Sequence, residues 1–231
     1  MNNAVINVDE IFIIIPKLLH NMDVTLYISI VSLLISLLGG LFFVALQEQK
    51  NRTIQKIVTG YLDVMRGSPL ILLILLFFYG GKLILSELGI SPQAISDNVF
   101  AILSISASMS AYFAEMMRSA YHAVDQGQKE AISSLNIPPF LGLIRIIFPQ
   151  GLIIAIPNLG NLLINIVKMT SLINIIGIID IFGRAQKISQ NSYGVKQAEA
   201  FISVVLIYWA INVLIFAVMK ALEKRYRHIL N

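Results

Sequence analysis

Long apolar stretches that contain almost no charged residue recur five times along this sequence. A helix needs about 20 apolar residues to cross the hydrocarbon core of a bilayer, and each stretch has a length of that order. We predict spans at about residues 22–46, 67–86, 98–119, 150–179 and 199–221. Lipid cannot pair with exposed backbone amides, so each span must be an α-helix. The sequence therefore predicts an all-α, polytopic membrane protein.

The composition agrees with lipid as the main solvent. Of the 231 residues, 57% are hydrophobic and 13% are charged, against roughly 45–50% and 25% in soluble domains. No linker or low-complexity tract divides the chain, so we expect one transmembrane domain over residues 1–231. The sequence contains no cysteine, which excludes disulfides, thiol catalysis and cysteine-based metal sites.

Basic residues in the loops, near the span ends and in the C-terminal tail divide unequally between the two sides of the membrane. One side collects ten of them: Lys50, Arg52, Lys56, Arg118, Lys129, Arg145, Lys220, Lys224, Arg225 and Arg227. The other side collects five: Lys17, Lys82, Arg184, Lys187 and Lys196. The positive-inside rule then places the N-terminus outside and the C-terminus in the cytoplasm. The same distribution explains the net charge of +4 without nucleic acid as a partner.

The loop between the third and fourth spans, residues 120–148, is too long for a simple connection. Within it, residues 126–135 combine good helix formers with an amphipathic pattern. Asn136 follows where a helix end favours a left-handed residue, and Pro138 and Pro139 stop the helix. We therefore predict a short helix lying across the cytoplasmic face.

The fourth span carries polar residues at helical spacing. They are Asn158, Asn161, Asn165 and Lys168. Offsets of three and four residues place them in one stripe along the helix. A lysine at the centre of a membrane helix costs at least ~2.5 kcal/mol unless it has a partner or water. The stripe is either the polar wall of a translocation path or a set of hydrogen bonds that join helices.

Other polar side chains are predicted to lie at helix ends. Glu115 and Arg118, three residues apart, are expected to form a structural ion pair at the end of the third span. Ser68 is expected to cap the second span, with Pro69 in its first turn. The apolar run before Pro16 predicts a short interfacial helix that breaks at this proline.

The histidines indicate neither a metal site nor an enzyme. His20, His122 and His228 lie outside the apolar spans and lack the spacing of metal ligands. An intramembrane hydrolase would need a nucleophile and a base at one depth, and the histidines do not supply one.

Short motifs in order along nearly the whole chain resemble those of permease subunits of ATP-binding cassette (ABC) importers. Residues 127–131 (GQKEA), 135–136 (LN) and 147–150 (IFPQ) resemble the "EAA" loop of these subunits. Ile132 and Asn136 depart from that pattern, at positions where an alanine and a glycine are usual. Five further motifs are similar to the polar amino acid importers: 21–26 (NMDVTL), 66–70 (RGSPL), 111–118 (AYFAEMMR), 157–161 (PNLGN) and 168–172 (KMTSL).

The resemblance implies a type I ABC importer permease fold with a short cytoplasmic coupling helix. It implies that the following residues couple the chain to an ATPase: Gly127, Glu130, Ala131, Ser134, Leu135 and Asn136. It also adds Ser171 to the candidate translocation path formed by Asn158, Asn161, Asn165 and Lys168.

The same resemblance implies partners and location. The expected partners are two ATP-binding subunits, a second permease chain, identical or not, an extracellular or periplasmic solute-binding protein and the bilayer of a bacterial cell membrane. This chain has no G-x-x-x-x-G-K-S/T phosphate-binding loop. We therefore expect it to bind no cofactor and to be no enzyme, with ATP and magnesium used by the partner subunits.

The implied function is alternating-access import of polar amino acids delivered by the external binding protein. Residues 177–184 (GIIDIFGR) resemble members that handle cystine or related amino acids. An ATP-independent secondary transporter or channel, with Lys168 as a gate, is the alternative. Uptake that persists without ATPase partners would favour that alternative.

Overall fold

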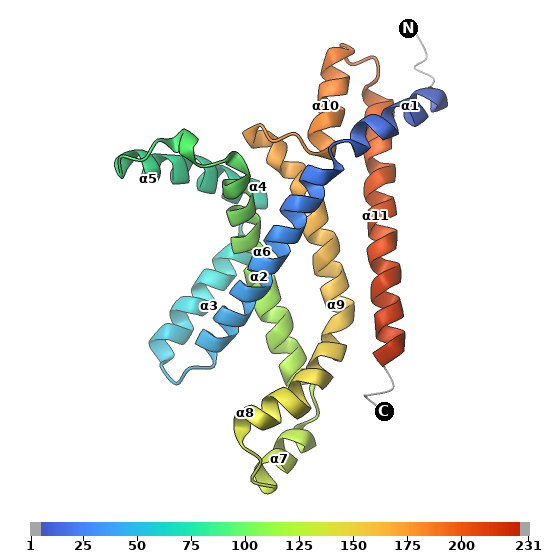
Figure 1. Ribbon diagram of the computed structural model, residues 1–231. Coiled ribbons are helices and arrows are strands. Elements are labelled where there is room, and N and C mark those ends of the chain that lie inside the picture. Colours follow the sequence, from blue (N-terminus) through green and yellow to red (C-terminus); the bar gives the residue numbers. More distant parts are fainter. Residues whose placement is uncertain (1–5, 227–231) are drawn as a thin grey trace. The chain divides into compact units, whose positions relative to one another are not determined.

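The computed structural model describes residues 6–226, and within this range the backbone forms helices and no β-strand (Figure 1). The first elements are α1 Val8–Leu19, α2 Met22–Gln47, α3 Arg52–Gly67, α4 Leu70–Leu75, the π-helix η1 Leu76–Gly80, α5 Gly81–Glu87 and the 3-10 helix η2 Pro92–Ala94. The remaining elements are α6 Asp97–Ala123, α7 Gln126–Ser134, α8 Pro139–Gly142, the π-helix η3 Leu143–Ile147, α9 Phe148–Met169, the 3-10 helix η4 Thr170–Ile176, α10 Ile181–Asn191 and α11 Gln197–Tyr226. The predicted all-α class is confirmed.

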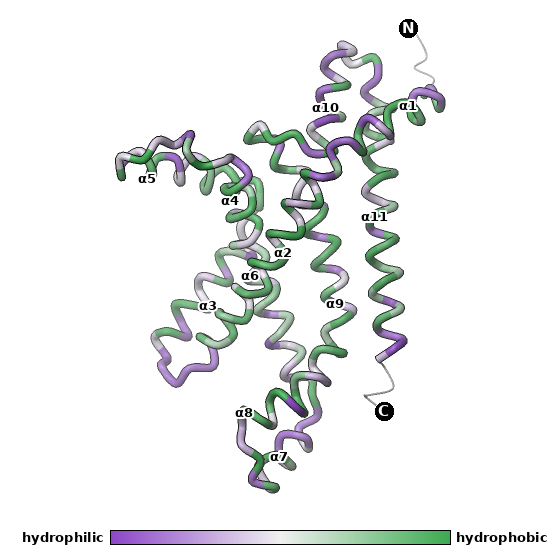
Figure 2. The backbone as a smooth tube through the Cα atoms, viewed as in Figure 1, coloured by the Kyte–Doolittle hydropathy of each residue, from purple (hydrophilic) through white to green (hydrophobic). Residues whose placement is uncertain are grey.

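Five helical segments among the described residues are long and apolar enough to cross a membrane, as predicted. They are Met22–Gln47, Leu70–Glu87, Asp97–Ala123, Pro139–Ile176 and Gln197–Tyr226. Figure 2 shows hydrophobic residues along most of α2 and α11. The fourth segment begins well before the expected residue 150, because α8 and η3 lead into α9 without a break.

Helix α3 was not expected from the sequence, which predicted a loop and then a span from residue 67. Arg66 lies in the last turn of α3 instead of preceding a helix start. Helix α3 ends at Gly67, and α4 begins three residues later at Leu70. The expected Ser68 cap is therefore wrong: the N-cap residue of α4 is Pro69, and no side chain caps this helix. Pro69 supplies the fixed φ that a helix start accepts.

Helix α1 does not break at Pro16. Its N-cap is Asn7, whose side chain accepts hydrogen bonds from the backbone N–H groups of Asp9 and Glu10. The helix then runs from Val8 to Leu19. An internal proline costs one backbone hydrogen bond. Buried Ile14 and Leu18 lie on either side of Pro16, and their packing holds both turns in place.

The chain divides into two compact units, and the expectation of one transmembrane domain stays a prediction. The first unit comprises residues 1–34, 68–106 and 165–213, and the second comprises 35–67, 107–164 and 214–231. Helices α2, α6, α9 and α11 each contribute residues to both units.

In the first unit, polar contacts fasten α1 to the N-terminal part of α11 and the residue before it. The backbone N–H of Asn7 donates to Oε1 of Glu199 at 3.1 Å, and Lys196 lies 2.8 Å from the carboxylate of Glu10. The hydroxyl of Ser203 donates to the carbonyl of Ile11 at 3.5 Å. These contacts join segments that lie almost 200 residues apart in the sequence.

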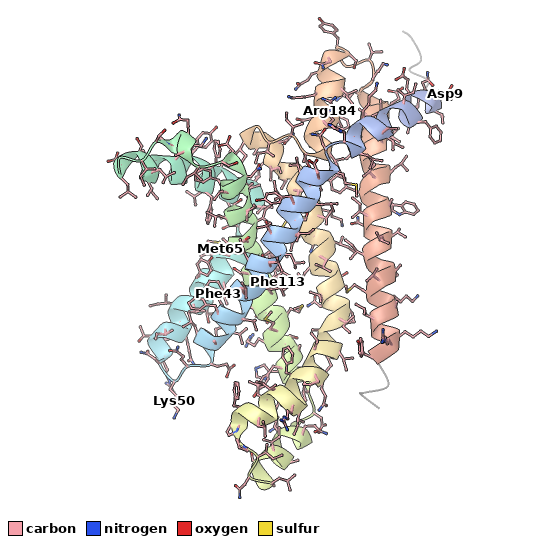
Figure 3. The ribbon with its side chains drawn as sticks, in the orientation of Figure 1. Asp9, Phe43, Lys50, Met65, Phe113 and Arg184 are labelled. Atoms are coloured by element: carbon pink, nitrogen blue, oxygen red, sulfur yellow. The ribbon has the colours of Figure 1, made fainter. Side chains whose placement is uncertain are left out.

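In the second unit, α3 packs on α2 and α6 through a small apolar core. Val58 and Leu62 of α3 are buried with Ala111 and Ala114 of α6. Phe43 of α2 and Met65 of α3, both labelled in Figure 3, are among the partly buried side chains packed against this core. Small residues let α2 and α6 approach closely: a Cβ on Gly40 would lie 2.8 Å from Cβ of Phe113.

Candidate functional site

Helix α7 begins at a side-chain cap. Asp125 is the N-cap residue, with φ = −51° and ψ = 133°, and its Oδ1 accepts a hydrogen bond from the backbone N–H of Gly127 at 2.8 Å. A carboxylate in this position satisfies one of the free N–H groups of the first turn and favours the positive end of the helix dipole. The short helix predicted over residues 126–135 is observed as Gln126–Ser134, with Leu135 as its C-cap.

The end of α7 depends on Asn136. This residue has φ = 52°, the left-handed conformation that the sequence predicts there. The N–H of Ile137 donates to the carbonyl of Ile132 at 3.0 Å. The N–H of Asn136 donates to the carbonyl of Ser133 at 3.2 Å. This is the hydrogen-bond pattern of a Schellman turn, so asparagine supplies here what glycine usually supplies.

One side of α7 is buried within the second unit. Ile132 packs with Val124, which follows α6, and with Ile147, which precedes α9. Gly142 makes this contact possible, because a Cβ there would lie 2.7 Å from Cγ2 of Ile132. Ile132 therefore connects α7 to the end of α6 and to the residues just before α9.

The other side of α7 is open. All six residues predicted to couple to an ATPase are exposed: Gly127, Glu130, Ala131, Ser134, Leu135 and Asn136. Leu135 keeps 72% of its surface exposed, as does Phe140 in α8. Contiguous exposed apolar surface rimmed by polar residues is typical of a site where another protein binds.

The predicted polar stripe of α9 lies on exposed surface. Asn158 and Asn161 are exposed in the second unit, and Asn165 and Lys168 are exposed in the first. Neighbours on other sides of α9, such as Leu162 and Ile166, are buried. Ser171 lies beyond α9 in η4, where it is half-buried and its hydroxyl donates to the carbonyl of Lys168 at 2.7 Å. The amides and the ammonium group are thus turned away from this chain's own core.

The structure brings Glu115 and Arg118 together and adds two residues that the sequence analysis missed. Arg118 lies 3.1 Å from Glu115, and Arg66 of α3 lies 3.4 Å from the same carboxylate and 2.7 Å from Asp63. The hydroxyl of Tyr112 donates to the carbonyl of Arg66 at 3.1 Å. The pair is therefore part of a charge network that ties the end of α3 to α6.

A second polar cluster, in the first unit, was also missed. Asp180 is buried, caps α10 by accepting from the N–H of Gly183 at 2.8 Å, and accepts from the hydroxyl of Tyr208 at 3.1 Å. The hydroxyl of Thr170 lies 3.5 Å from that of Tyr208. Burial raises the pKa of the Asp180 carboxyl, and the hydrogen bonds from Gly183 and Tyr208 lower it by a smaller amount.

The histidines that the structure describes do not gather with acidic groups. His20 and His122 are exposed, and His228 lies outside the described residues. Within residues 6–226, no three side chains of the metal-ligating types come together as a site for an ion.

Comparison with known families places the sequence among transport proteins. The sequence pattern of the family described as "Binding-protein-dependent transport system inner membrane component" matches residues 36–228. The L-cystine transport system permease protein TcyL of Bacillus subtilis is 31% identical over 211 residues, which cover 91% of this chain and 87% of that protein. A putative glutamine transport system permease protein, GlnP of Rickettsia prowazekii, is 31% identical over 183 residues, covering 77% and 80%.

Solved structures agree with the sequence matches. A chain of an amino acid ABC transporter crystallised with histidines is 26% identical, covers 96% of this chain and 99% of its own length, and superimposes with a TM-score of 0.83. A chain of the MetNI methionine ABC transporter in an inward-facing conformation shares the fold with a TM-score of 0.74 at 17% identity, covering 91% and 96%.

Proposed function

The chain belongs to the family of binding-protein-dependent transport system inner membrane components, and from this membership we propose that it is the permease through which an ABC importer moves polar amino acids into a bacterial cell. Its partners are two ATP-binding subunits, a second permease chain and an external solute-binding protein. The ATP-binding subunits hold ATP and magnesium, and this chain carries no catalytic residue.

The proposal rests on how α7 is held in place. Both of its ends and one side are fixed by contacts within this chain, and its other side is exposed. Asp125 and Asn136 hold its ends, and Ile132 holds its inner side. The open side, with Ala131 and Leu135, is the surface that an ATP-binding subunit covers. ATP-driven closure of the two subunits then moves α7, and the apolar contact around Ile132 passes the movement to α6 and α9.

The polar stripe of α9 supports a translocation path beside a second permease chain. Three asparagines and Lys168 are expensive in lipid, since each leaves hydrogen-bonding capacity or charge unsatisfied there. A second permease chain that faces this stripe removes it from lipid and leaves water between the two chains. Amide groups and one ammonium group then line the path for a polar, carboxylate-bearing cargo.

The cargo belongs to the polar amino acids, and cystine is the first candidate. The residues 177–184 that resemble cystine permeases and the similarity to TcyL support this choice. The glutamine-named relatives make glutamine the second probe. Transport assays with both compounds in competition identify the preferred one.

The permease lies in the bacterial cell membrane with its N-terminus outside and its C-terminus in the cytoplasm. Ten basic residues against five support this orientation, although one of the ten, Arg227, lies outside the described residues. In this orientation α7 is cytoplasmic, on the side where ATP is available.

The decisive experiment alters the open side of α7. Ala131→Arg should leave the protein folded but reduce substrate-stimulated ATP hydrolysis and uptake by about tenfold or more, because a bulky cation blocks close docking. Ser133→Arg, on a different side of the same helix, is the matched control. Normal uptake by Ala131→Arg would contradict the docking role. Uptake in cells that lack the ATP-binding subunits would instead support a secondary transporter or channel.

A further inference from the structure

A cavity of about 230 Å³ lies within the second unit, between α9 and the C-terminal part of α11. Pro157, Gly160 and Asn161 line it from α9, and Phe216, Lys220 and Glu223 line it from α11. A water molecule occupies about 30 Å³ of liquid, and pockets for drug-sized ligands start at about 300 Å³. The cavity therefore suits a molecule with few heavy atoms.

The two helices touch at one side of this cavity. A Cβ on Gly160 would lie 2.9 Å from Cγ of Met219, so glycine allows the close approach of α11. Gly160 therefore sets how closely the side chain of Met219 approaches α9 beside the cavity. Asn161, which lines the cavity, also belongs to the polar stripe of α9, so the cavity adjoins the proposed path.

Lys220 and Glu223 supply opposite charges that do not neutralise each other. They lie three residues apart on α11, yet the described part of the chain provides no ion pair to either. The ammonium group of Lys220 lies 5.9 Å from the centroid of the Phe216 ring. Both side chains line the same cavity with their charges free of ion pairs within residues 6–226, so a ligand with both an anion and an ammonium group can pair with the two together.

We propose that this cavity binds a zwitterionic α-amino acid, with its carboxylate on Lys220, its ammonium group on Glu223 and a polar side chain on Asn161. The proposal rests on the proposed function and deepens it, because it gives the imported amino acid a last site before release.

The test measures binding to the purified full-length chain in nanodiscs of phosphatidylglycerol. The probes are radiolabelled L-cystine and L-glutamine, with glutaramic acid and 4-aminobutanamide as competitors that lack the α-amino group and the carboxylate, respectively. We expect one of the two amino acids to bind the wild-type chain saturably. We expect neither competitor to displace it. Lys220→Gln and Glu223→Gln should each weaken this binding by about tenfold or more. Lys224→Gln, one residue beyond the cavity lining, is the matched control and should bind as wild type does.

A variant in which the two charges are exchanged distinguishes a loss of binding from misfolding. The double variant Lys220→Glu/Glu223→Lys keeps one charge of each sign and should bind more tightly than either single glutamine variant. No amino acid binding by the wild-type chain, or equal binding by all variants, would overturn the proposal. Displacement of the probe by phosphatidylethanolamine alone would also overturn it, because that head group carries the same two charges and would then be the true occupant.

Failure of this site and failure of the proposed function have different signatures. ATP-dependent uptake that is unchanged by Lys220→Gln and Glu223→Gln would overturn the site while the permease function stands. Charge-dependent binding by a chain that neither associates with an ATP-binding subunit nor supports uptake would support the site and contradict the proposed function.

Discussion

Tyr208 of α11 donates its hydroxyl to Oδ2 of Asp180, the residue that caps α10, at a distance of 3.1 Å. Asp180 is fully buried, and the described residues place no Lys or Arg side chain in an ion pair with it. A buried carboxylate without a cation depends on its hydrogen bonds. The contact therefore fastens α10 to α11 within the first unit.

Removal of the Tyr208 hydroxyl is the direct test of this contact. We expect Tyr208→Phe to lower the free energy of unfolding by about 1–3 kcal/mol, because a buried acceptor loses its donor. Thermal unfolding in detergent micelles measures the loss. Tyr79→Phe is the matched control, since Tyr79 is 63% exposed and its hydroxyl makes no hydrogen bond within the described residues. Equal losses in both variants would show that the Asp180 contact does not stabilise the fold.

The same carboxyl should make stability depend on pH. Its pKa is raised in the folded protein, chiefly by burial, so the folded state holds this proton more firmly than the unfolded state. Its contribution is fully present below the unfolded pKa of about 3.9 and is lost as pH rises through the higher, folded pKa. Relative to Asp180→Asn, the wild-type chain should therefore gain thermal stability from about pH 7 to about pH 4. A difference between the two proteins that stays constant over this range would contradict the assignment.

The sequence predicts well those structural features of this chain that depend on residues close together along it. Apolar run lengths predict the five spans. The amphipathic pattern of residues 126–135, Asn136 and the following prolines predict α7, because each signal depends on neighbouring residues. Helix α3 was missed because it is amphipathic instead of continuously apolar: Val58 and Leu62 are buried, while Lys56 and Asp63 are exposed. Only the helical period of its apolar residues could have indicated it.

Contacts between distant segments leave no such local pattern. Asp180 and Tyr208 lie 28 residues apart, on either side of α10, and neither residue is unusual in its own stretch of sequence. Arg66 likewise reaches Glu115 only because α3 runs beside α6. The burial of Asp180 and the full charge network around Glu115 therefore required the structure.

The close approach of α2 to α6 predicts opposite effects for two glycine substitutions. A Cβ on Gly40 would meet Cβ of Phe113 at 2.8 Å and the backbone nitrogen of Ala114 at 3.1 Å, so Gly40→Ala should destabilise the protein by about 1–3 kcal/mol. Gly60 lies within α3 with no atom within 4 Å of such a Cβ. Gly60→Ala should therefore stabilise the protein by about 0.5–1 kcal/mol. Melting temperatures that shift in the same direction would refute the packing argument.

The stripe on α9 has two interpretations, and labelling of introduced cysteines separates them. The chain contains no cysteine, so a single introduced thiol is the only one that reacts. Asn161→Cys and Asn165→Cys should react with a hydrophilic maleimide in the assembled transporter, because a thiol in a water-filled path can ionise, whereas one in apolar surroundings cannot. Val205→Cys, at an apolar position of α11 that is 65% exposed, is the control and should react about tenfold more slowly.

The outcome decides what the asparagines do. If the stripe only joins helices by hydrogen bonds, the thiols at 161 and 165 will be packed against another helix and will react no faster than the one at 205. If the stripe lines a path, a saturating amino acid cargo should slow the reaction at these two positions, because the cargo and the maleimide compete for the same water-filled space. Rapid labelling that is insensitive to cargo would place water at the stripe but exclude it as the route of transport.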